Sequence, residues 1–409
     1  MGDLLAELDT MNVGSNDGAE EANAAPVIKF VNLVIMQAIK EKASDIHLEP
    51  FEKEFKIRYR VDGALYEMAP PPVPLANSVI SRVKVMAGMN IAERRVPQDG
   101  RIVMKVGDAG VDMRVNSLPT QYGESVVMRV LDRNSVSLNL DNLNLSPHLH
   151  EYIIDTVNKP NGIFVVTGPT GSGKTTTLYA ALREVNTVDS KLLTAEDPVE
   201  YEMSGINQVM IRTEIGMTFA AALRAMLRQA PNIIMIGEIR DGETASIAIQ
   251  AAMTGHLVLS TLHTNDAPSS VARLADMGVD RFLIASAVRA VMAQRLCRSL
   301  CSCKIDGQLT PKQASTLGVD INRPVKVPRP GGCERCRGKG MKGRLGIFEI
   351  FEVTDDVRGL INSDLTSAQL RKRARELGMR TLREDGIRKV MAGLTSAEEI
   401  IRVTTGDAS

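Results

Sequence analysis

The first regular pattern along the chain is helical: from Pro26 onward, apolar residues recur three or four positions apart. Proline is well tolerated in the first turn of a helix, so the pattern predicts a helix that begins there. In residues 55–61, apolar and basic positions alternate, which indicates a strand with one buried face. The pair Asp62-Gly63 then predicts a tight turn into residues 64–68, and therefore a hairpin.

A second helix is expected at residues 78–86. Three strand-like runs follow it, at residues 101–106, 111–118 and 125–131. Glycine-containing stretches separate the runs, among them Asp99-Gly100, and predict turns. Residues 26–133 are therefore predicted to form a small α+β domain. The next segment, residues 134–145, is rich in Asn, Asp and Ser and is predicted to be a linker.

After residue 145 the pattern changes to short apolar runs that alternate with helical segments. This alternation is typical of a parallel sheet with right-handed crossovers. Each of four runs ends in polar residues, and such folds bind ligands at the carboxyl edge of the sheet. The four runs are residues 163–167, 191–195, 233–236 and 257–262. We therefore predict an α/β fold for residues 146–409, with short helices from about residue 355 to 409 at its end.

The first of these runs leads directly into a glycine-rich loop and then an apolar helical segment. The loop reads Gly168-Pro169-Thr170-Gly171-Ser172-Gly173-Lys174-Thr175-Thr176. Its glycines let backbone N–H groups converge on phosphate oxygens, and the helix N-terminus adds partial positive charge. Lys174 would hold the β- and γ-phosphates of a nucleotide, and the Thr175 hydroxyl would ligate Mg²⁺. Strand, loop and helix occur in the order that a P-loop requires. A glycine-rich turn that arose by chance would not be expected in this setting.

Composition excludes several classes of protein. The chain has 49 basic and 49 acidic residues, only 3% aromatic residues and no Trp, which argues against binding nucleic acid. No apolar run approaches the roughly 20 residues of a membrane helix, so we expect no integral membrane segment. The acidic residues 1–25 lack the features of a secretory signal and are predicted to form a flexible leader. Five cysteines clustered late in the chain indicate a reducing compartment and a metal site, and hence a cytoplasmic protein.

Four ordered motifs resemble those of the type II secretion and type IV pilus ATPase family. They are the P-loop, Thr194–Glu200, Gly237–Asp241 and Thr254–Asn265. Three shorter matches precede the linker, at Ser44–Pro50, Tyr59–Gly63 and Pro97–Arg101. The resemblance implies a homohexameric motor, driven by Mg-ATP, with a RecA-like P-loop core after a PAS-like domain (residues 26–133). Such a motor is peripheral at the inner membrane and works with a platform protein there.

Within this family we expect the branch that drives assembly of a type IV pilus. The ATPase of a type II secretion pseudopilus is the alternative inside the family, and a nucleic-acid translocase on a RecA-like core is the alternative outside it. Family members usually carry a further N-terminal domain that recruits them to the platform, and no segment here resembles it. We therefore expect either a piece of a longer chain or another mode of docking.

The resemblance also implies roles for individual residues. The family's catalytic base is expected at Glu200, just after a core strand, where a carboxylate can deprotonate the attacking water. Glu238 takes the place of the usual Walker B aspartate and would hold Mg²⁺ through water, although spacing alone leaves open which glutamate is the base. His263 resembles a γ-phosphate sensor. Arg101 and Arg114 match arginines that the family brings over the nucleotide, where a guanidinium stabilises the charge on the transferring phosphoryl group.

The assembly and secretion branches of the family carry two cysteine pairs that bind structural zinc, whereas retraction motors generally lack them. Here the first pair departs from the usual C-x-x-C spacing, because it is either Cys301-Ser-Cys303 or Cys297-x-x-x-Cys301. Zinc prefers four tetrahedral ligands. We predict a zinc subdomain at about residues 297–344, with Cys297 as a buried thiol on a helix, and reduced cysteines without metal as the alternative. The predicted ligands are Cys301, Cys303, Cys333 and Cys336.

Overall fold

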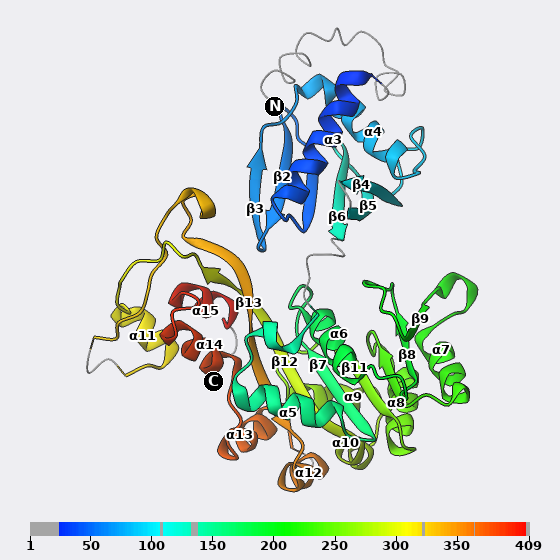
Figure 1. Ribbon diagram of the computed structural model, residues 1–409, viewed down its shortest axis with the longest axis vertical. Coiled ribbons are helices and arrows are strands. Elements are labelled where there is room, and N and C mark those ends of the chain that lie inside the picture. The colour runs from blue at the N-terminus through cyan, green and yellow to red at the C-terminus, as the bar shows by residue number, and fades with distance from the viewer. Residues whose placement is uncertain (1–23, 107–108, 132–137, 321–323, 364, 406–409) are drawn as a thin grey trace. The chain divides into compact units, whose positions relative to one another are not determined.

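The computed structural model describes residues 24–106, 109–131, 138–320, 324–363 and 365–405 (Figure 1). The chain divides into two compact units, Met1–Val136 and Ser137–Ser409, and each is considered by itself. The predicted leader lies almost entirely outside the described residues. In the part of the chain that the structure describes, no helix is both long enough and apolar enough to cross a membrane.

The first unit is a six-stranded antiparallel sheet in the order β3-β2-β1-β6-β5-β4, packed against two helices. Val27, Val31 and Val34 of the first helix are buried in its core, as the helical spacing predicted. The elements are α3 (Ala25–Lys40), β1 (Asp45–Pro50), β2 (Phe55–Val61), β3 (Ala64–Met68), the 3₁₀-helix η1 (Val73–Leu75), α4 (Ala76–Met86), β4 (Gln98–Val106), β5 (Ala109–Thr120) and β6 (Gly123–Leu131). The predicted helices, the hairpin β2–β3 and the three later strands are confirmed.

Two features of this unit differ from the sequence-based expectation. The central strand β1 was not predicted, although it pairs with both β2 and β6. The turn predicted at Asp99-Gly100 is wrong, because both residues lie inside β4. A Cβ on Gly100 would lie 2.5 Å from the carbonyl oxygen of Ala87. Glycine is therefore required there for the close approach of two backbones rather than for a turn.

The second unit is a seven-stranded sheet in the order β13-β12-β7-β11-β10-β8-β9, in which β13 alone runs antiparallel to its neighbour. Its strands are β7 (Gly162–Thr167), β8 (Leu192–Glu196), β9 (Ile206–Met210), β10 (Ile233–Ile236), β11 (Leu257–Leu262), β12 (Val288–Leu300) and β13 (Met341–Glu352). The four predicted strands are confirmed and fully buried. The α/β fold with a parallel sheet is therefore confirmed, while β9, β12 and β13 were not predicted.

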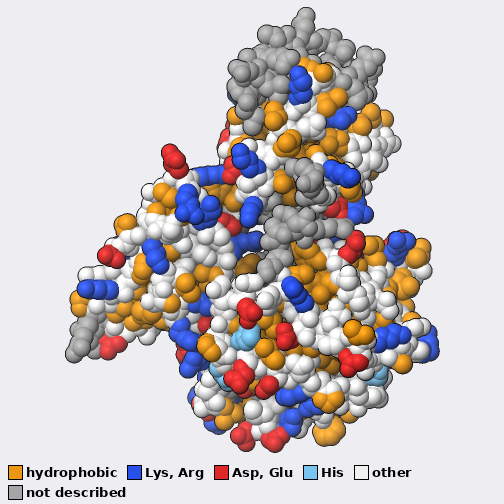
Figure 2. Space-filling model, viewed as in Figure 1, with side chains coloured by type: hydrophobic (Ala, Val, Ile, Leu, Met, Phe, Trp, Pro, Cys, Tyr) orange, Lys and Arg blue, Asp and Glu red, His pale blue; other side chains and the backbone are white. Residues whose placement is uncertain are grey.

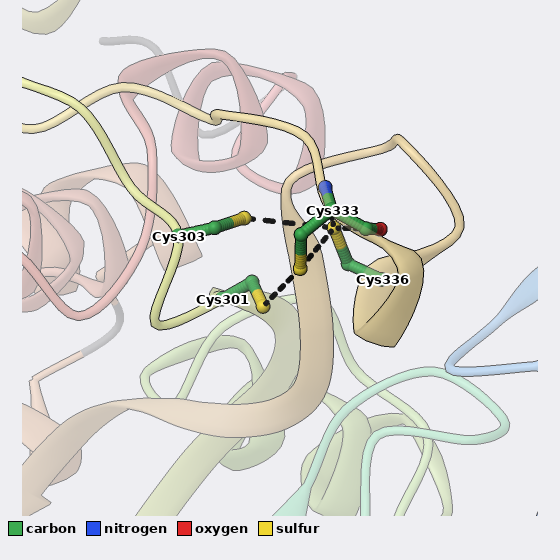
Figure 3. A group of neighbouring side chains, drawn as sticks. All are labelled: Cys301, Cys303, Cys333 and Cys336. Carbon is green, nitrogen blue, oxygen red and sulfur yellow. Dashed lines mark hydrogen bonds between the residues drawn. The ribbon is translucent and has the colours of Figure 1, made fainter.

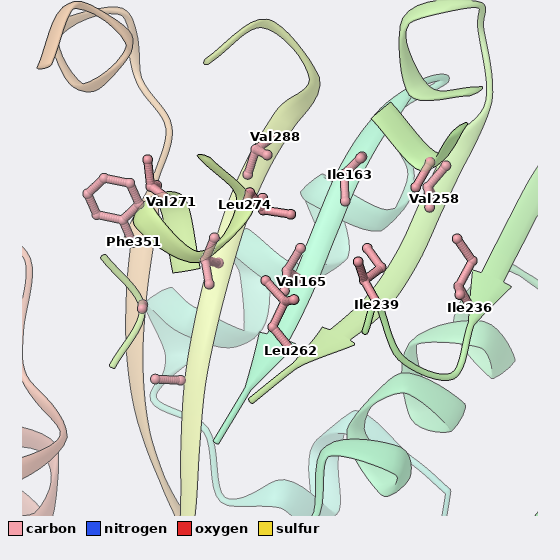
Figure 4. Packing of buried hydrophobic residues seen from close by; sticks show 14 of the residues in the cluster. Ile163, Val165, Ile236, Ile239, Val258, Leu262, Val271, Leu274, Val288 and Phe351 are labelled. Atoms are coloured by element: carbon pink, nitrogen blue, oxygen red, sulfur yellow. The ribbon is translucent and has the colours of Figure 1, made fainter. Parts of the chain in front are cut away.

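Helices cover both faces of this sheet. On β7, Ile163 and Val165 face one core with residues of α8, α9 and α10, and Phe164 and Val166 face the other with α5 and α6 (Figures 1 and 4). The helices up to β12 are η2 (Leu140–Leu143), α5 (Pro147–Val157), α6 (Lys174–Val185), η3 (Thr213–Ile215), α7 (Phe219–Met226), η4 (Leu227–Gln229), α8 (Gly242–Met253), α9 (Ser269–Asp276) and α10 (Arg281–Ala287). Those that follow are α11 (Pro311–Leu317), η5 (Glu334–Cys336), α12 (Asp355–Asn362), α13 (Ser367–Glu376), α14 (Leu382–Met391) and α15 (Ala397–Val403).

The predicted linker, residues 134–145, is too long at its carboxyl end. Leu140 is buried in the core of the second unit, and Leu143 and Leu145 pack against that core. The Asn139 side chain accepts a hydrogen bond from the Asp141 N–H and so caps η2. The polar residues that suggested a linker therefore cap a short helix, while the leucines between them anchor it.

Candidate functional site

The loop between β7 and α6 has a backbone shape that glycine permits. Gly168 has φ = 143°, and a Cβ there would lie 2.3 Å from the Gln294 carbonyl oxygen. Gly173 precedes α6 with φ = 87°, in the left-handed region. The chain therefore enters the helix through a conformation that other residues rarely adopt, and this leaves the N-terminus of α6 open to an anion.

Two polar side chains in this loop fit a phosphate group. Lys174 is buried, and its Nζ donates to the carbonyl oxygens of Gly168 at 2.8 Å and Pro169 at 3.1 Å. Burial lowers the pKa of Lys174, and the charge of Glu238 opposes that shift. The Ser172 hydroxyl is buried and has no hydrogen-bond partner among the described residues. Because a buried polar atom is normally paired, an orphaned hydroxyl in a P-loop fits a site for phosphate oxygens.

Polar residues at the carboxyl ends of β10 and β11 form a second part of the site. Glu238 follows β10, and its carboxylate lies 3.4 Å from Nε2 of His263, which follows β11. Arg240 contacts the same carboxylate and lies 3.7 Å from the carboxylate of Asp197. Although burial raises the pKa of Glu238, Arg240 and His263 hold it below its ordinary value. Glu238 is therefore ionised, and its charge acts on Lys174. Because Mg²⁺ prefers oxygen ligands, Glu238 and the exposed Thr175 at the start of α6 are the residues that would hold it.

Glu200 lies on the segment after β8, and a residue of α6 holds the backbone of this segment. The Tyr179 hydroxyl accepts hydrogen bonds from the N–H groups of Glu200 at 3.3 Å and Tyr201 at 3.4 Å, and it donates to the buried Glu196. Burial raises the pKa of Tyr179, so its hydroxyl keeps its proton and remains a donor. The position of Glu200 therefore depends on the helix that begins with Lys174.

Sequence reasoning assigned no role to Arg240, Tyr179 or Glu196. The only signal for Arg240 and Glu196 was their presence in the motifs Gly237–Asp241 and Thr194–Glu200, and Tyr179 lies in an ordinary helical run. Arg240 also reaches Asp197 after β8, and Tyr179 reaches Glu196 and Glu200 from α6. No local pattern reveals these contacts between separate segments.

Arg101 and Arg114 lie in the first unit, directly opposite each other in the register of β4 and β5. Arg101 forms a two-point ion pair with the buried carboxylate of Asp112, with distances of 2.8 and 2.5 Å. Its side chain is nevertheless 59% exposed, so part of the guanidinium faces solvent. The predicted adjacency of the two arginines is present in the structure, and their role toward a nucleotide remains a prediction.

The four cysteines chosen from the sequence lie together (Figure 3). Their sulfur atoms all fall within 4.8 Å of one another. The measured separations are 3.9 Å for Cys301–Cys333 and 3.6 Å for both Cys303–Cys336 and Cys333–Cys336. An ion with tetrahedral bonds of about 2.3 Å would separate its sulfurs by about 3.8 Å. The cluster therefore fits a closed, structural zinc site, which would join the loop after β12 to η5.

Cys297 is buried as predicted, but it lies on strand β12 and not on a helix. Its sulfur donates to the carbonyl oxygen of Leu345 on β13, at 3.6 Å. Burial raises the pKa of Cys297 to about 11, so the thiol keeps its proton, and its sulfur does not belong to the cluster of four.

We expect elemental analysis to find about one Zn²⁺ per chain. Cys333→Ser should release the metal and lower the thermal stability, because the metal would no longer join the segment after β12 to η5, whereas turnover per folded molecule should change less. Cys297→Ser is the matched control and should retain the metal. Loss of zinc from Cys297→Ser but not from Cys303→Ser would show that the ligand set is wrong.

Comparison with known proteins identifies the family. The profile of the Type II/IV secretion system protein family matches residues 20–402. The chain is 48% identical over 394 residues to type II secretion system protein E of Pectobacterium carotovorum subsp. carotovorum, covering 95% of this chain and 78% of that protein. It is 47% identical over 404 residues to the type IV pilus assembly ATPase PilB of Myxococcus xanthus (strain DK1622), covering 98% and 71%.

Solved structures share the fold at lower identity. The ATPase DotB of Legionella pneumophila aligns with a TM-score of 0.70 and 22% identity, over 92% of this chain and 96% of that one. The pilus retraction motor PilT with bound ADP aligns with a TM-score of 0.61 and 24% identity, over 91% and 96%. The P-loop geometry and the extent of the family match lead to one conclusion: this chain belongs to the Type II/IV secretion system protein family and is an ATP hydrolase.

Proposed function

We propose that this protein is a homohexameric motor that hydrolyses Mg-ATP to drive assembly of a type IV pilus. It acts in the cytoplasm, peripheral to the inner membrane, and docks on a platform protein there. The observation that carries the assembly direction is the four-cysteine cluster, which the family's retraction motors generally lack. On the face of the second unit seen in Figure 2, basic and acidic side chains are interspersed, which gives no support to a nucleic-acid translocase.

Each site residue has a role in this proposal. Lys174 and the backbone N–H groups of the P-loop bind the phosphates of ATP. Thr175 and Glu238 would hold Mg²⁺, which would neutralise charge on the phosphates. Glu200 takes a proton from a water molecule while the oxygen of that water attacks the γ-phosphorus. The bond from that phosphorus to the β–γ bridging oxygen breaks, and ADP and phosphate are released. His263, placed beside Glu238, contacts the γ-phosphate.

Arg101 and Arg114 supply the link between hydrolysis and movement. Because they belong to the first unit, they can grip the γ-phosphate only when that unit closes over the nucleotide. Release of phosphate removes the charge that they hold, so the units can reopen. In a ring, where each first unit would also pack on a neighbouring ATPase unit, this opening and closing moves the neighbour.

We expect Arg101→Ala and Arg114→Ala each to lower ATP turnover by about 10³-fold, the lower end of the range for an arginine that stabilises the transferring phosphoryl group. ADP affinity should hardly change, because most ADP contacts remain with the P-loop. Arg129→Ala is the matched control, since Arg129 faces Arg114 across β5 and β6 but pairs with Asp45. Closure induced by a non-hydrolysable ATP analogue, followed by small-angle scattering, should fade in both variants. If Arg101→Ala and Arg114→Ala close and hydrolyse ATP normally, then Arg101 and Arg114 are ordinary surface residues.

Genetic complementation tests the proposed function as a whole. Cells that lack the gene should regain surface pili with the parent protein but not with Lys174→Ala. The pseudopilus ATPase is the second candidate, because secretion proteins match this chain as closely as pilus ATPases do, at 48% identity. Restored protein secretion without pili would select it. Turnover stimulated by DNA would instead support the translocase. Light scattering of the purified protein with nucleotide tests the hexamer.

A further inference from the structure

Thr264, which follows His263, is hydrogen-bonded to Thr167, which precedes the P-loop. Thr167 is the last residue of β7, and Gly168 follows it directly. The N–H of Thr264 donates to the Thr167 hydroxyl at 2.8 Å, and the two hydroxyl groups are also 2.8 Å apart. The loop that carries His263 is therefore fixed on one side to the strand that leads into the P-loop.

On its other side, the same loop is fixed by an ion pair to helix α13. The carboxylate of Asp266 is contacted by the guanidinium of Arg371, and the two side chains are 8% and 23% exposed. The same carboxylate accepts a hydrogen bond from the N–H of Ser269 at 2.9 Å, where α9 begins. Because the pair is largely shielded from water, its loss would leave a buried carboxylate without its cation.

Two neighbouring loop residues are held by other late elements of the chain. The N–H of Ala267 donates to the buried carboxyl group of Glu349 on β13, at 2.8 Å. Arg295 of β12 donates to the carbonyl oxygens of Asn265, at 3.3 Å, and of Val403 in α15. Each residue from 264 to 267 is therefore bonded to a different element of the ATPase unit, in turn β7, β12, α13 and β13, and α15 is connected only through Arg295.

We infer that Arg371 is a positioning residue for ATP hydrolysis: by holding Asp266, helix α13 fixes the loop that places His263 beside Glu238. The inference rests on the proposed role of His263. It assigns to helix α13 an indirect part in shaping the nucleotide site, through an ion pair between residues about a hundred positions apart in sequence. Since the P-loop binds ATP through other residues, the effect should fall on kcat rather than on KM.

Steady-state kinetics of the full chain test this inference. Arg371→Ala should lower kcat by about tenfold or more while changing KM for ATP by less than about twofold. Arg371→Lys keeps a cation at the site and should recover part of the loss, and it also serves if the alanine variant does not fold. Arg373→Ala is the matched control, since Arg373 lies on the same helix, is 61% exposed and pairs only with Glu376 among the partners recorded. Its kcat should stay at the parental value.

A double-mutant comparison separates this role from a general structural one. If Arg371 acts through His263, then Arg371→Ala should add little to the loss already caused by His263→Ala. Losses that multiply, or an unchanged kcat in Arg371→Ala, would overturn the inference. Normal hydrolysis by His263→Ala would overturn it as well, because the loop would then hold no group that the reaction uses. The ATPase activity of the parent protein tests the proposed motor function independently of these outcomes.

Discussion

Lys174→Ala is expected to lower ATP turnover by about 10²- to 10³-fold or more, while the protein remains folded. The Lys174 ammonium group is buried in the P-loop and donates only to the loop carbonyls of Gly168 and Pro169 among its recorded hydrogen bonds. It is therefore placed to move onto the β- and γ-phosphates, where it offsets the charge that develops as the phosphoryl group transfers. Without it, the backbone N–H groups still bind phosphate, but the transition state loses one of the cations that offset its charge.

Release of phosphate at saturating Mg-ATP measures this effect, and thermal unfolding checks the fold. Lys191→Ala is a suitable control. Lys191 directly precedes β8, at the amino ends of the parallel strands and away from the P-loop at their carboxyl ends, and it donates to the carbonyl oxygen of Gln229. The control should hydrolyse ATP at the parental rate. Near-normal hydrolysis by Lys174→Ala would contradict the assignment of the P-loop.

The second large effect is expected from the two glutamates, and it distinguishes their roles. Glu200→Gln should still bind Mg-ATP but hydrolyse it about 10²- to 10⁴-fold more slowly, because an amide cannot accept the proton of the attacking water. Glu238→Gln should also shift the Mg²⁺ concentration required for activity, since the ionised carboxylate beside Arg240 and His263 is the expected contact of the metal.

Magnesium titrations of both variants, with nucleotide binding measured separately, make the comparison. Glu184→Gln is a control for the loss of a carboxylate, because Glu184 is exposed near the end of α6. If the Mg²⁺ concentration required for activity shifts in Glu200→Gln, and Glu238→Gln only loses rate, then Glu238 is the catalytic base and Glu200 is the contact of the metal.

Much of the candidate site could be read from the sequence because its chemistry lies in short, contiguous motifs. The P-loop needs glycine where the backbone adopts positive φ, and Lys174 follows at a fixed spacing, so local order was sufficient to recognise it. Glu238 and His263 could be placed at one edge because parallel strands bring their carboxyl ends together. Tyr179, which holds the segment of Glu200, could not be recognised, because its contacts run from α6 to β8 and to the segment after it. Arg240 lies two residues from Glu238, but the sequence does not show that their side chains meet or that Arg240 also reaches Asp197.

The sequence by itself determined the α/β class, the four buried strands and the P-loop, since each depends on a local pattern. It left two choices for the first cysteine pair, and the structure brings Cys301 and Cys303 to Cys333 and Cys336. Only the tertiary structure decided that Cys297 lies on β12, that β12 pairs with β13, and that Arg371 reaches the loop after His263. A continuous apolar run such as residues 290–293 is fully buried, and its periodicity does not separate a strand from a helix. Strand pairing and long-range ion pairs are set by packing between segments far apart in the chain, and that packing exists only once the fold has formed.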